Sequence, residues 1–214
     1  MKFFPTTVVD GFFKDPDPVL ELAESVEYDD IAETNYTGVA SSNNLKEIDE
    51  DLFNIIIERL FGYYWDLINP LDYQMYMEFH RIDSLSKGIL NKGVIHSDSS
   101  IAGGVIYLNK NPLKNTGTSF YNLVDESYKP SNDFLESMRR YHSGKDVDEL
   151  EKKCKMHYNK YEETMRVQNQ YNRLCMYSGD VFHAPTSYGN QIRYTLRFFV
   201  DELQSEYQNY PLLR

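Results

Sequence analysis

The sequence predicts a mainly β protein with flanking helices, built on a double-stranded β-helix (jelly-roll) core that carries a helical insertion. Three observations lead to this prediction. Strand-like runs of β-branched and aromatic residues, separated by turn residues, fill 72–122 and 171–200. Segments with helical spacing occupy the N-terminal support, 1–71, and a polar stretch, 123–170, separates the two strand-rich parts. A jelly roll buries the inner faces of two sheets and leaves one mouth open for a ligand.

Two helices are expected after an opening strand and turn in TTVVDGFF. Asp17 followed by Pro18 is typical of a helix start, with aspartate as the cap and proline at the first helical position. This helix should end near Glu27. A second helix is expected over 48–68, where apolar residues recur at helical spacing and Pro70 ends the pattern. We expect it to pack on the outer face of the core.

The segment 123–170 separates the two halves of the core. Residues 131–168 are rich in charged side chains of both signs, and we expect them to be helical. One interpretation is a peripheral decoration of the fold. The other is a lid or substrate platform, because the segment leaves and re-enters the core between the candidate site residues. The sequence favours neither.

Composition restricts the class of protein. The chain has 214 residues, which suits one domain, and is 41% hydrophobic and 14% aromatic, as expected for a globular protein. Its net charge of −11 argues against a nucleic-acid partner. No apolar run is long enough to span a membrane, and MKFFPTTVVDG lacks the features of a signal peptide. Cys154 and Cys175 form no motif, so two reduced thiols in a cytoplasmic protein are expected.

Three residues have the chemistry of a metal site. His96 and Asp98 stand two residues apart in VIHSDSS, and His183 follows in GDVFHAP. We read the first segment as a strand, in which residues i and i+2 point to the same face, so His96 and Asp98 can reach one ion. Two imidazoles and one carboxylate leave three positions of an octahedral ion open, as in non-haem Fe(II) oxygenases. An H-x-D pair alone is weak evidence, and the order of the later motifs strengthens it.

A cation for an acidic ligand follows in the last strand, 191–200. Arg193, Thr195 and Arg197 share one face of it by parity. A buried dicarboxylate needs a cation, and a guanidinium offers a bidentate fork that lysine lacks. The two arginines are about 13 Å apart at ~3.3 Å per residue, so they cannot serve one carboxylate. We assign that role to Arg193 and expect Arg197 to form a surface ion pair.

In this order the motifs resemble the 2-oxoglutarate/Fe(II) dioxygenase superfamily, and within it the prolyl-hydroxylase branch and its small stand-alone relatives in phages and bacteria. The resemblance covers roughly 72–200, and no single motif is specific, but five in the right order are. The motifs are H-x-D at 96–98, Y-L-N at 107–109, Gly-Thr at 117–118, the distal His183, and R-Y at 193–194. One departure is that Tyr76 lies too far before His96 to take the role of a further family tyrosine.

The resemblance implies a single oxygenase domain in which His96, Asp98 and His183 bind Fe(II) and are catalytic. Arg193 and Tyr107 would bind the C5 carboxylate of 2-oxoglutarate, with Thr195 as an additional hydroxyl donor. Ascorbate is an optional further cofactor. The implied reaction hydroxylates a second substrate and releases succinate and CO2. The carboxylate ligand favours hydroxylation, because halogenases of this superfamily leave that position for chloride.

Two other functions stay open. One is a non-catalytic, cupin-like jelly-roll binding module, against which the intact triad and Arg193 count. The other is a cupin-type metal-dependent hydrolase or isomerase, but cupins prefer more histidines and need no distal arginine. A protein side chain, a free amino acid and a small metabolite all remain open as the substrate. Of the remaining histidines, we expect His142 and His157 to face solvent and His80 to be structural or substrate-lining.

Overall fold

The computed structural model describes residues 6–29, 38–65, 70–83, 91–130 and 147–204. Within them most helices precede β3 (Asp72–Ile82), and strands dominate from β3 onward. The helices are α1 (Asp17–Ser25), α2 (Leu45–Ile48), α3 (Glu50–Gly62) and α5 (Val147–Tyr158). The strands are β1 (Thr7–Asp10), β2 (Val39–Ala40), β3 (Asp72–Ile82), β4 (Ala102–Tyr107), β5 (Gly117–Leu123), β6 (Tyr161–Gln168), β7 (Arg173–Ser178), β8 (Phe182–Pro185) and β9 (Arg193–Gln204).

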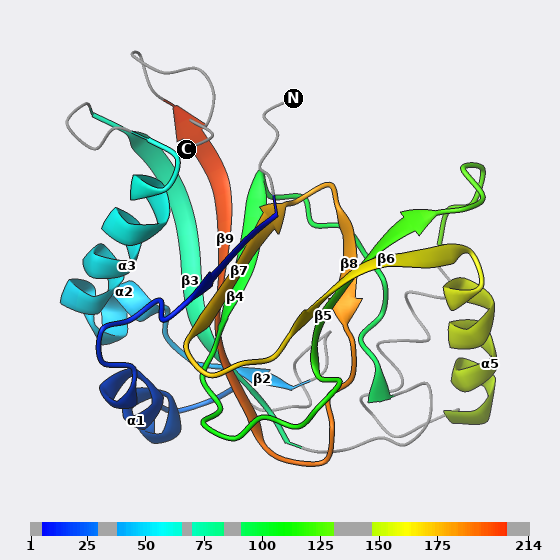
Figure 1. Ribbon diagram of the computed structural model, residues 1–214, viewed down its shortest axis with the longest axis horizontal. Helices are drawn as coiled ribbons and strands as arrows, with labels where there is room; N and C mark the ends of the chain where they lie inside the picture. Colours follow the sequence, from blue (N-terminus) through cyan, green and yellow to red (C-terminus); the bar gives the residue numbers. More distant parts are fainter. Residues whose placement is uncertain (1–5, 30–37, 66–69, 84–90, 131–146, 205–214) are drawn as a thin grey trace.

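Two antiparallel sheets make up the core. The larger has the strand order β1-β7-β4-β9-β3-β2, and the smaller has the order β6-β5-β8. Figure 1 shows helices α1 to α3 on the outer side of the larger sheet and α5 beyond the smaller sheet, at the opposite end of the molecule. The prediction of a mainly β jelly roll with flanking helices is therefore confirmed.

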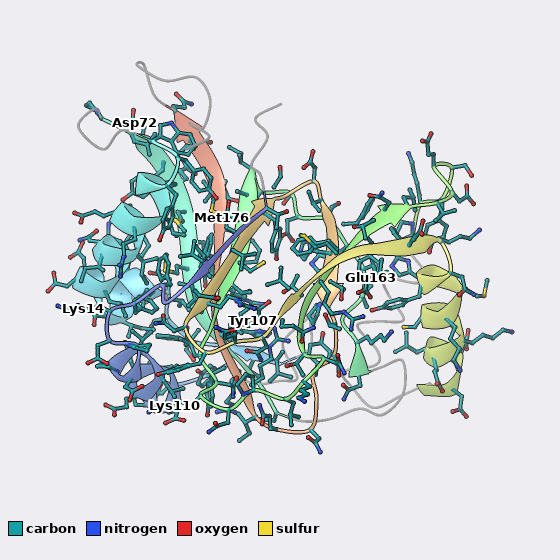
Figure 2. All side chains as sticks on the ribbon, viewed as in Figure 1. Lys14, Asp72, Tyr107, Lys110, Glu163 and Met176 are labelled. Carbon is teal, nitrogen blue, oxygen red and sulfur yellow. The ribbon has the colours of Figure 1, made fainter. Side chains whose placement is uncertain are left out.

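Alternate residues of strand β9 face opposite sides of the larger sheet and contribute to two different interior regions. Leu196, Phe198 and Val200 belong to the large hydrophobic cluster that also contains Ile56 and Leu60 of α3. Helix α3 therefore packs on the outer face of the larger sheet, as expected. Residues of the opposite parity on the same sheet face the smaller sheet, and Tyr107 at the end of β4 lies between the two sheets (Figure 2). This inner space holds the candidate site.

The N-terminal helices begin differently from the prediction. The helix expected over 48–68 is two helices, because Asp49 is extended (φ −153°) and its carboxylate accepts a hydrogen bond from the Leu52 N–H at 2.9 Å. Asp49 thus caps α3 and separates it from α2. Residues 66–69 lie outside the described part. Asp17 is the first residue of α1 and not its cap, and its carboxylate pairs with Lys110.

The helical prediction for 131–168 is wrong over its last part. Helix α5 ends at Tyr158, and Tyr161–Gln168 form β6, which pairs with β5 over seven register positions. Most β6 side chains are exposed, so their polarity resembles that of a solvated helix. The free edge of β5 decides the conformation instead, because it offers backbone partners for a strand. Residues 131–146 of the predicted insertion, and His142 with them, lie outside the described part.

Across the ranges described, the helices are too short and too polar for any of them to cross a bilayer.

Candidate metal and co-substrate site

Backbone hydrogen bonds bring the two candidate histidines side by side. His96 donates its N–H to the His183 carbonyl (3.0 Å) and accepts from the His183 N–H (2.8 Å). This is an isolated bridge, so the segment around His96 is not the regular strand that the sequence predicted. Asp98 is held by a separate hydrogen bond, in which its N–H donates to the Gly179 carbonyl at 2.7 Å. The turn between β7 and β8 therefore places the aspartate beside both imidazoles.

The three side chains converge on one point. Ligand atoms of His96, Asp98 and His183 all lie within 4.8 Å of one another. The two carboxylate oxygens of Asp98 face different rings, with Oδ1 3.6 Å from His96 Nε2 and Oδ2 3.6 Å from His183 Nε2. Both separations exceed a normal hydrogen bond. Ligand atoms that are each about 2 Å from a shared ion are at most about 4 Å apart, so these separations suit one metal ion.

Both imidazoles are held in the tautomer that a metal requires. Nδ1 of His96 lies 2.8 Å from the Val94 carbonyl, and Nδ1 of His183 lies 2.9 Å from the Val181 carbonyl. Since a carbonyl can only accept, each Nδ1 of a neutral ring carries the proton and donates it. Each Nε2 then presents its lone pair toward Asp98. Such outer contacts orient metal-binding histidines and fix the ring that coordinates.

The electrostatics of the triad also suit a cation. Burial, reinforced by the neighbouring His96, lowers the pKa of His183 to about 3, so this ring is neutral at pH 7. Burial raises the pKa of the Asp98 carboxyl, against the opposing effects of His96 and Arg197. Asp98 Oδ2 is buried and has no hydrogen-bond partner among the described residues. A divalent ion would neutralise that carboxylate and satisfy its oxygen.

Arg193 forms a second, separate feature between the sheets. Its side chain is buried (4% exposed), and Nε and Nη1 have no hydrogen-bond partner in the described part of the chain. The guanidinium carbon lies 5.5 Å from the centre of the Tyr107 ring. Burial lowers the pKa of Arg193, against the effect of nearby tyrosines. An unpaired cation in such a place is costly, so this site fits an anionic ligand.

The other two expected co-substrate residues surround this guanidinium. Tyr107 is fully buried, and its hydroxyl lies 2.7 Å from Thr118 Oγ1 of β5. Thr195 is buried and is the register partner of Tyr107 on β9. The structure thus brings Arg193, Tyr107 and Thr195 into one place, with Thr118 as a further hydroxyl. The pairing of β4 with β9 reveals these neighbours, and sequence spacing alone does not.

Arg197 differs from the prediction in its surroundings. It pairs with Glu78 on β3, directly opposite in the register, but the two side chains are only 15% and 6% exposed. The expected ion pair is therefore present but joins a half-buried arginine to a buried glutamate, and is not a surface pair. His80, two residues along β3, is opposite Thr195 and so borders the same inner face.

Two residues near the site were missed by sequence reasoning. Tyr177 of β7 is buried, and its ring centre lies 4.4 Å from that of His183. The alternation of Cys175 and Tyr177 with the outer-face residues of β7 is a signal that could have found it. His157 of α5, expected to face solvent, is 1% exposed and donates from Nε2 to the Ile95 carbonyl at 2.8 Å. Its spacing from Leu150 and Cys154, which are also buried, is the helical pattern that could have found it.

Comparison with known proteins gives a family and a fold. Residues 4–187 match the model of DUF6445, described as a family of unknown function. The chain belongs to the DUF6445 family. No curated protein sequence matches it. The family description therefore assigns no activity to the chain.

Solved structures share the fold of this DUF6445 member. HygX from Streptomyces hygroscopicus, with nickel and 2-oxoglutarate bound, has a TM-score of 0.55 and 11% identity, covering 92% of this chain and 82% of HygX. A prolyl hydroxylase from Trichoplax adhaerens, in complex with a hypoxia inducible factor peptide, has a TM-score of 0.54 and 10% identity, covering 92% and 83%. The epimerase SnoN, in complex with Fe3+, alpha ketoglutarate and nogalamycin RO, has a TM-score of 0.52 and 11% identity. The chain therefore has the fold of the 2-oxoglutarate/Fe(II) oxygenases, and the predicted resemblance is confirmed at that level.

Proposed function

We propose that this protein is a 2-oxoglutarate- and Fe(II)-dependent oxygenase that hydroxylates a second substrate and forms succinate and CO2 as co-products. One observation carries the proposal. The space between the sheets contains a carboxylate oxygen beside two oriented imidazoles, and also a buried guanidinium, and neither group is satisfied by the residues that the structure describes. A divalent metal ion would bind the carboxylate oxygen and the imidazoles, and a carboxylate would pair with the guanidinium. One molecule of 2-oxoglutarate has both a metal-chelating end and a distal carboxylate.

A continuous wall of buried rings joins the two features. Tyr177 contacts the His183 ring, and Tyr107 lies under the Arg193 guanidinium. Both tyrosines belong to one hydrophobic cluster between the sheets, together with Phe120, Val167 and Cys175. These buried rings form an apolar surface beside both the triad and the arginine. A small dicarboxylate lying along it would be shielded from solvent.

The roles of the residues follow from their donor groups. His96, Asp98 and His183 would hold Fe(II), which when bound with 2-oxoglutarate supplies the oxidising chemistry. Arg193 would form a bidentate ion pair with the C5 carboxylate and so orient the co-substrate. Tyr107 and Thr195 would add hydroxyl contacts to the same carboxylate. The carboxylate ligand Asp98 favours hydroxylation over halogenation.

A binding module with the same fold is the less favoured alternative. Such a module has no need for a buried guanidinium without partners together with a His-Asp-His cluster. Either feature costs folding free energy unless a ligand satisfies it.

The test combines metal binding with turnover. We expect the purified protein to bind Mn(II) in calorimetric titration, and to form succinate after anaerobic loading with Fe(II) and addition of oxygen. Asp98→Ala and His183→Ala should abolish both. Asp180→Asn, which removes an exposed carboxylate from the neighbouring turn, should retain both. Wild-type protein that binds Mn(II) no better than Asp98→Ala would contradict the proposal.

A further inference from the structure

A small cavity opens beside Asp98 on the side of the larger sheet. Its volume is about 270 Å³, slightly below the usual range for drug-sized ligands. It therefore has room for one side chain or a small molecule. The residues that line it are Tyr76, Asp98, Ser99, Ser100, Phe199 and Asp201.

Two aromatic rings form one wall of this cavity. Tyr76 of β3 and Phe199 of β9 are direct register partners, so their side chains lie next to each other on the same face of the sheet. Tyr76 is 42% exposed although it is aromatic. Adjacent ring faces that remain accessible beside a polar site can bind apolar groups or cations.

A β-bulge supplies a carboxylate at the same place. Val200 pairs with Met75 and Glu202 pairs with Gln74, so Asp201 between them has no register partner. Bulges redirect side chains and are frequent beside active sites. The Asp201 carboxylate lines the cavity and makes no hydrogen bond or ion pair with a described residue.

A buried hydroxyl lies at the edge of the cavity. Ser100 is 9% exposed, lines the cavity, and its Oγ has no hydrogen-bond partner in the part of the chain that the structure describes. A buried hydroxyl normally has one. The Oγ itself is not accessible from the cavity, so it is not among the groups that would contact a bound molecule.

The charge of the lining selects the ligand. Its six residues include two carboxylates and no cation. Arg197, the preceding inward-facing residue of β9, is paired with Glu78 and does not line the cavity. If Asp98 binds the metal, the carboxylate of Asp201 is the charged group of the lining that can interact with the substrate. An anionic substrate would be repelled, whereas an ammonium ion would meet two rings and a carboxylate.

We propose that this cavity is the substrate pocket and that it recognises an alkylammonium group, with the charge at Asp201 and the alkyl part against Tyr76 and Phe199. The proposal rests on the proposed function, because it takes the cavity to be the neighbour of a metal centre. The source of the ammonium group can be a lysine side chain in a peptide or a free small amine, and both fit the volume.

The experiment measures binding of defined probes to protein loaded with Mn(II) and 2-oxoglutarate, by calorimetry or ligand-observed NMR. The probes are N-acetyl-lysine methylamide and cadaverine, each compared with an uncharged counterpart, N-acetyl-norleucine methylamide and pentanol. We expect at least one ammonium probe to bind tenfold or more tightly than its counterpart. The lysine derivative and cadaverine separate a peptide side chain from a free amine.

Variants test the residues. Asp201→Asn should remove the preference for the charged probe, and Tyr76→Leu should weaken binding of that probe about two- to fivefold. Glu202→Gln removes the same charge from the adjacent, exposed position and should keep the preference. Equal binding of charged and neutral probes, or an unchanged preference in Asp201→Asn, would overturn the pocket proposal while Mn(II) still binds. Failure of the wild-type protein to bind Mn(II) would instead overturn the proposed function.

Discussion

Two arginines on the same face of β9 show how partners decide the role of a residue. Arg197 lies opposite the buried Glu78 and forms a part-buried ion pair with it. Arg193 lies opposite Ile82 of β3, which offers no charge, and its Nε and Nη1 have no partner among the described residues. The first arginine is satisfied by the fold. No described residue satisfies the second in this way, which is why we propose that Arg193 binds the 2-oxoglutarate carboxylate.

The first residue-scale prediction concerns Arg193→Ala. Losing one partner of a buried ion pair costs about 3–5 kcal/mol, so the dissociation constant of 2-oxoglutarate should rise at least about a hundredfold. Calorimetric titration of Mn(II)-loaded protein measures it. Arg166→Ala, which removes a surface arginine paired with Glu163, is the control and should bind normally. Arg197→Ala is unsuitable as a control, since it strands the buried Glu78. Unchanged affinity in Arg193→Ala would show that the carboxylate binds elsewhere.

The second concerns Tyr107→Phe. The change removes the hydroxyl that contacts Thr118 and leaves the buried ring in place under Arg193. We expect a smaller loss of 2-oxoglutarate affinity, about 0.5–1.5 kcal/mol, as for one hydrogen bond. The same titration measures it. A loss as large as that of Arg193→Ala would mean that the hydroxyl, and not the guanidinium, dominates the binding of the carboxylate.

The third is a pH effect at His157. Burial lowers the pKa of this ring, and His96 contributes in the same direction against the hydrogen bond to Ile95. The rings of Tyr128, Tyr158 and Tyr161 surround it. Below pH about 6.5 the unfolded chain binds a proton on His157 that the folded protein does not, so stability falls as pH falls, by up to about 1.4 kcal/mol per unit.

Urea unfolding of metal-free wild type and His157→Gln at several pH values between 7.5 and 5 isolates this effect. Two other buried groups affect the pH dependence of stability in both proteins. Burial lowers the pKa of His183, which makes stability fall further as pH falls, and raises the pKa of Asp98, which has the opposite effect. The difference between the two slopes therefore belongs to His157, and the wild-type slope should be the steeper one. Parallel slopes would contradict the assignment.

At the scale of elements, the segment 123–170 is neither a simple decoration nor wholly an insertion. Its last part, β6, extends the smaller sheet. Its helix α5 holds the segment that leads to His96: His157 donates to the Ile95 carbonyl, and the Tyr158 hydroxyl donates to the Gly93 carbonyl. That segment has no regular strand structure of its own, so these side chains replace the partners that a neighbouring strand would provide.

We predict that Tyr158→Phe weakens both the fold and the metal site. Loss of one hydrogen bond should lower the free energy of unfolding by about 0.5–1.5 kcal/mol. Mn(II) affinity should fall as well, up to tenfold, because His96 loses part of its support. Met156→Ala, at an exposed position of the same helix, should change neither quantity. Reduced stability with unchanged Mn(II) affinity would limit α5 to a structural role.

The hypothesis that 123–170 also selects the substrate stays a prediction. Replacing 128–166 by a linker would remove most of β6 together with α5, so such a deletion cannot separate selection from folding. Charge reversal at the exposed Lys152 and Lys155 of α5 tests it instead. If α5 contacts the substrate, succinate formation stimulated by substrate should change while the rate without substrate does not.

At the scale of the whole molecule, the site joins parts of the chain that are far apart. His183 belongs to the smaller sheet and Arg193 to the larger one, whereas His96 and Asp98 lie in the segment between β3 and β4, where His96 forms a bridge to His183. A metal ion together with 2-oxoglutarate would therefore link both sheets. Ligands that bind only the folded state stabilise it in proportion to the logarithm of their concentration.

We accordingly predict that Mn(II) and 2-oxoglutarate raise the melting temperature together. At a hundredfold excess over the dissociation constant, each saturated site contributes about 2.7 kcal/mol. Addition of EDTA should reverse the shift. In differential scanning calorimetry Arg193→Ala should keep the contribution of the metal and lose that of 2-oxoglutarate, whereas His183→Ala should lose both. A shift in His183→Ala equal to that of wild type would place the metal elsewhere.

The site was predicted from patterns that are short along the chain. The spacing of His96 and Asp98, the position of His183 before a proline, and the parity of Arg193 and Thr195 on one strand are all visible along the chain. The larger sheet was predictable for the same reason, because an alternating strand such as β9 specifies its buried face through local periodicity.

The sequence by itself therefore determined the fold class, the outer helical layer and the residues that converge between the sheets. Only the tertiary structure decided that Asp49 separates two helices, that 161–168 is a strand, that Arg197 pairs with the buried Glu78, and that His157 donates to the Ile95 carbonyl next to His96. The physical reason is common to these cases. Each depends on a partner that lies across a sheet or in another element, or on competition between local hydrogen bonds, and neither is encoded in the periodicity of hydrophobic residues.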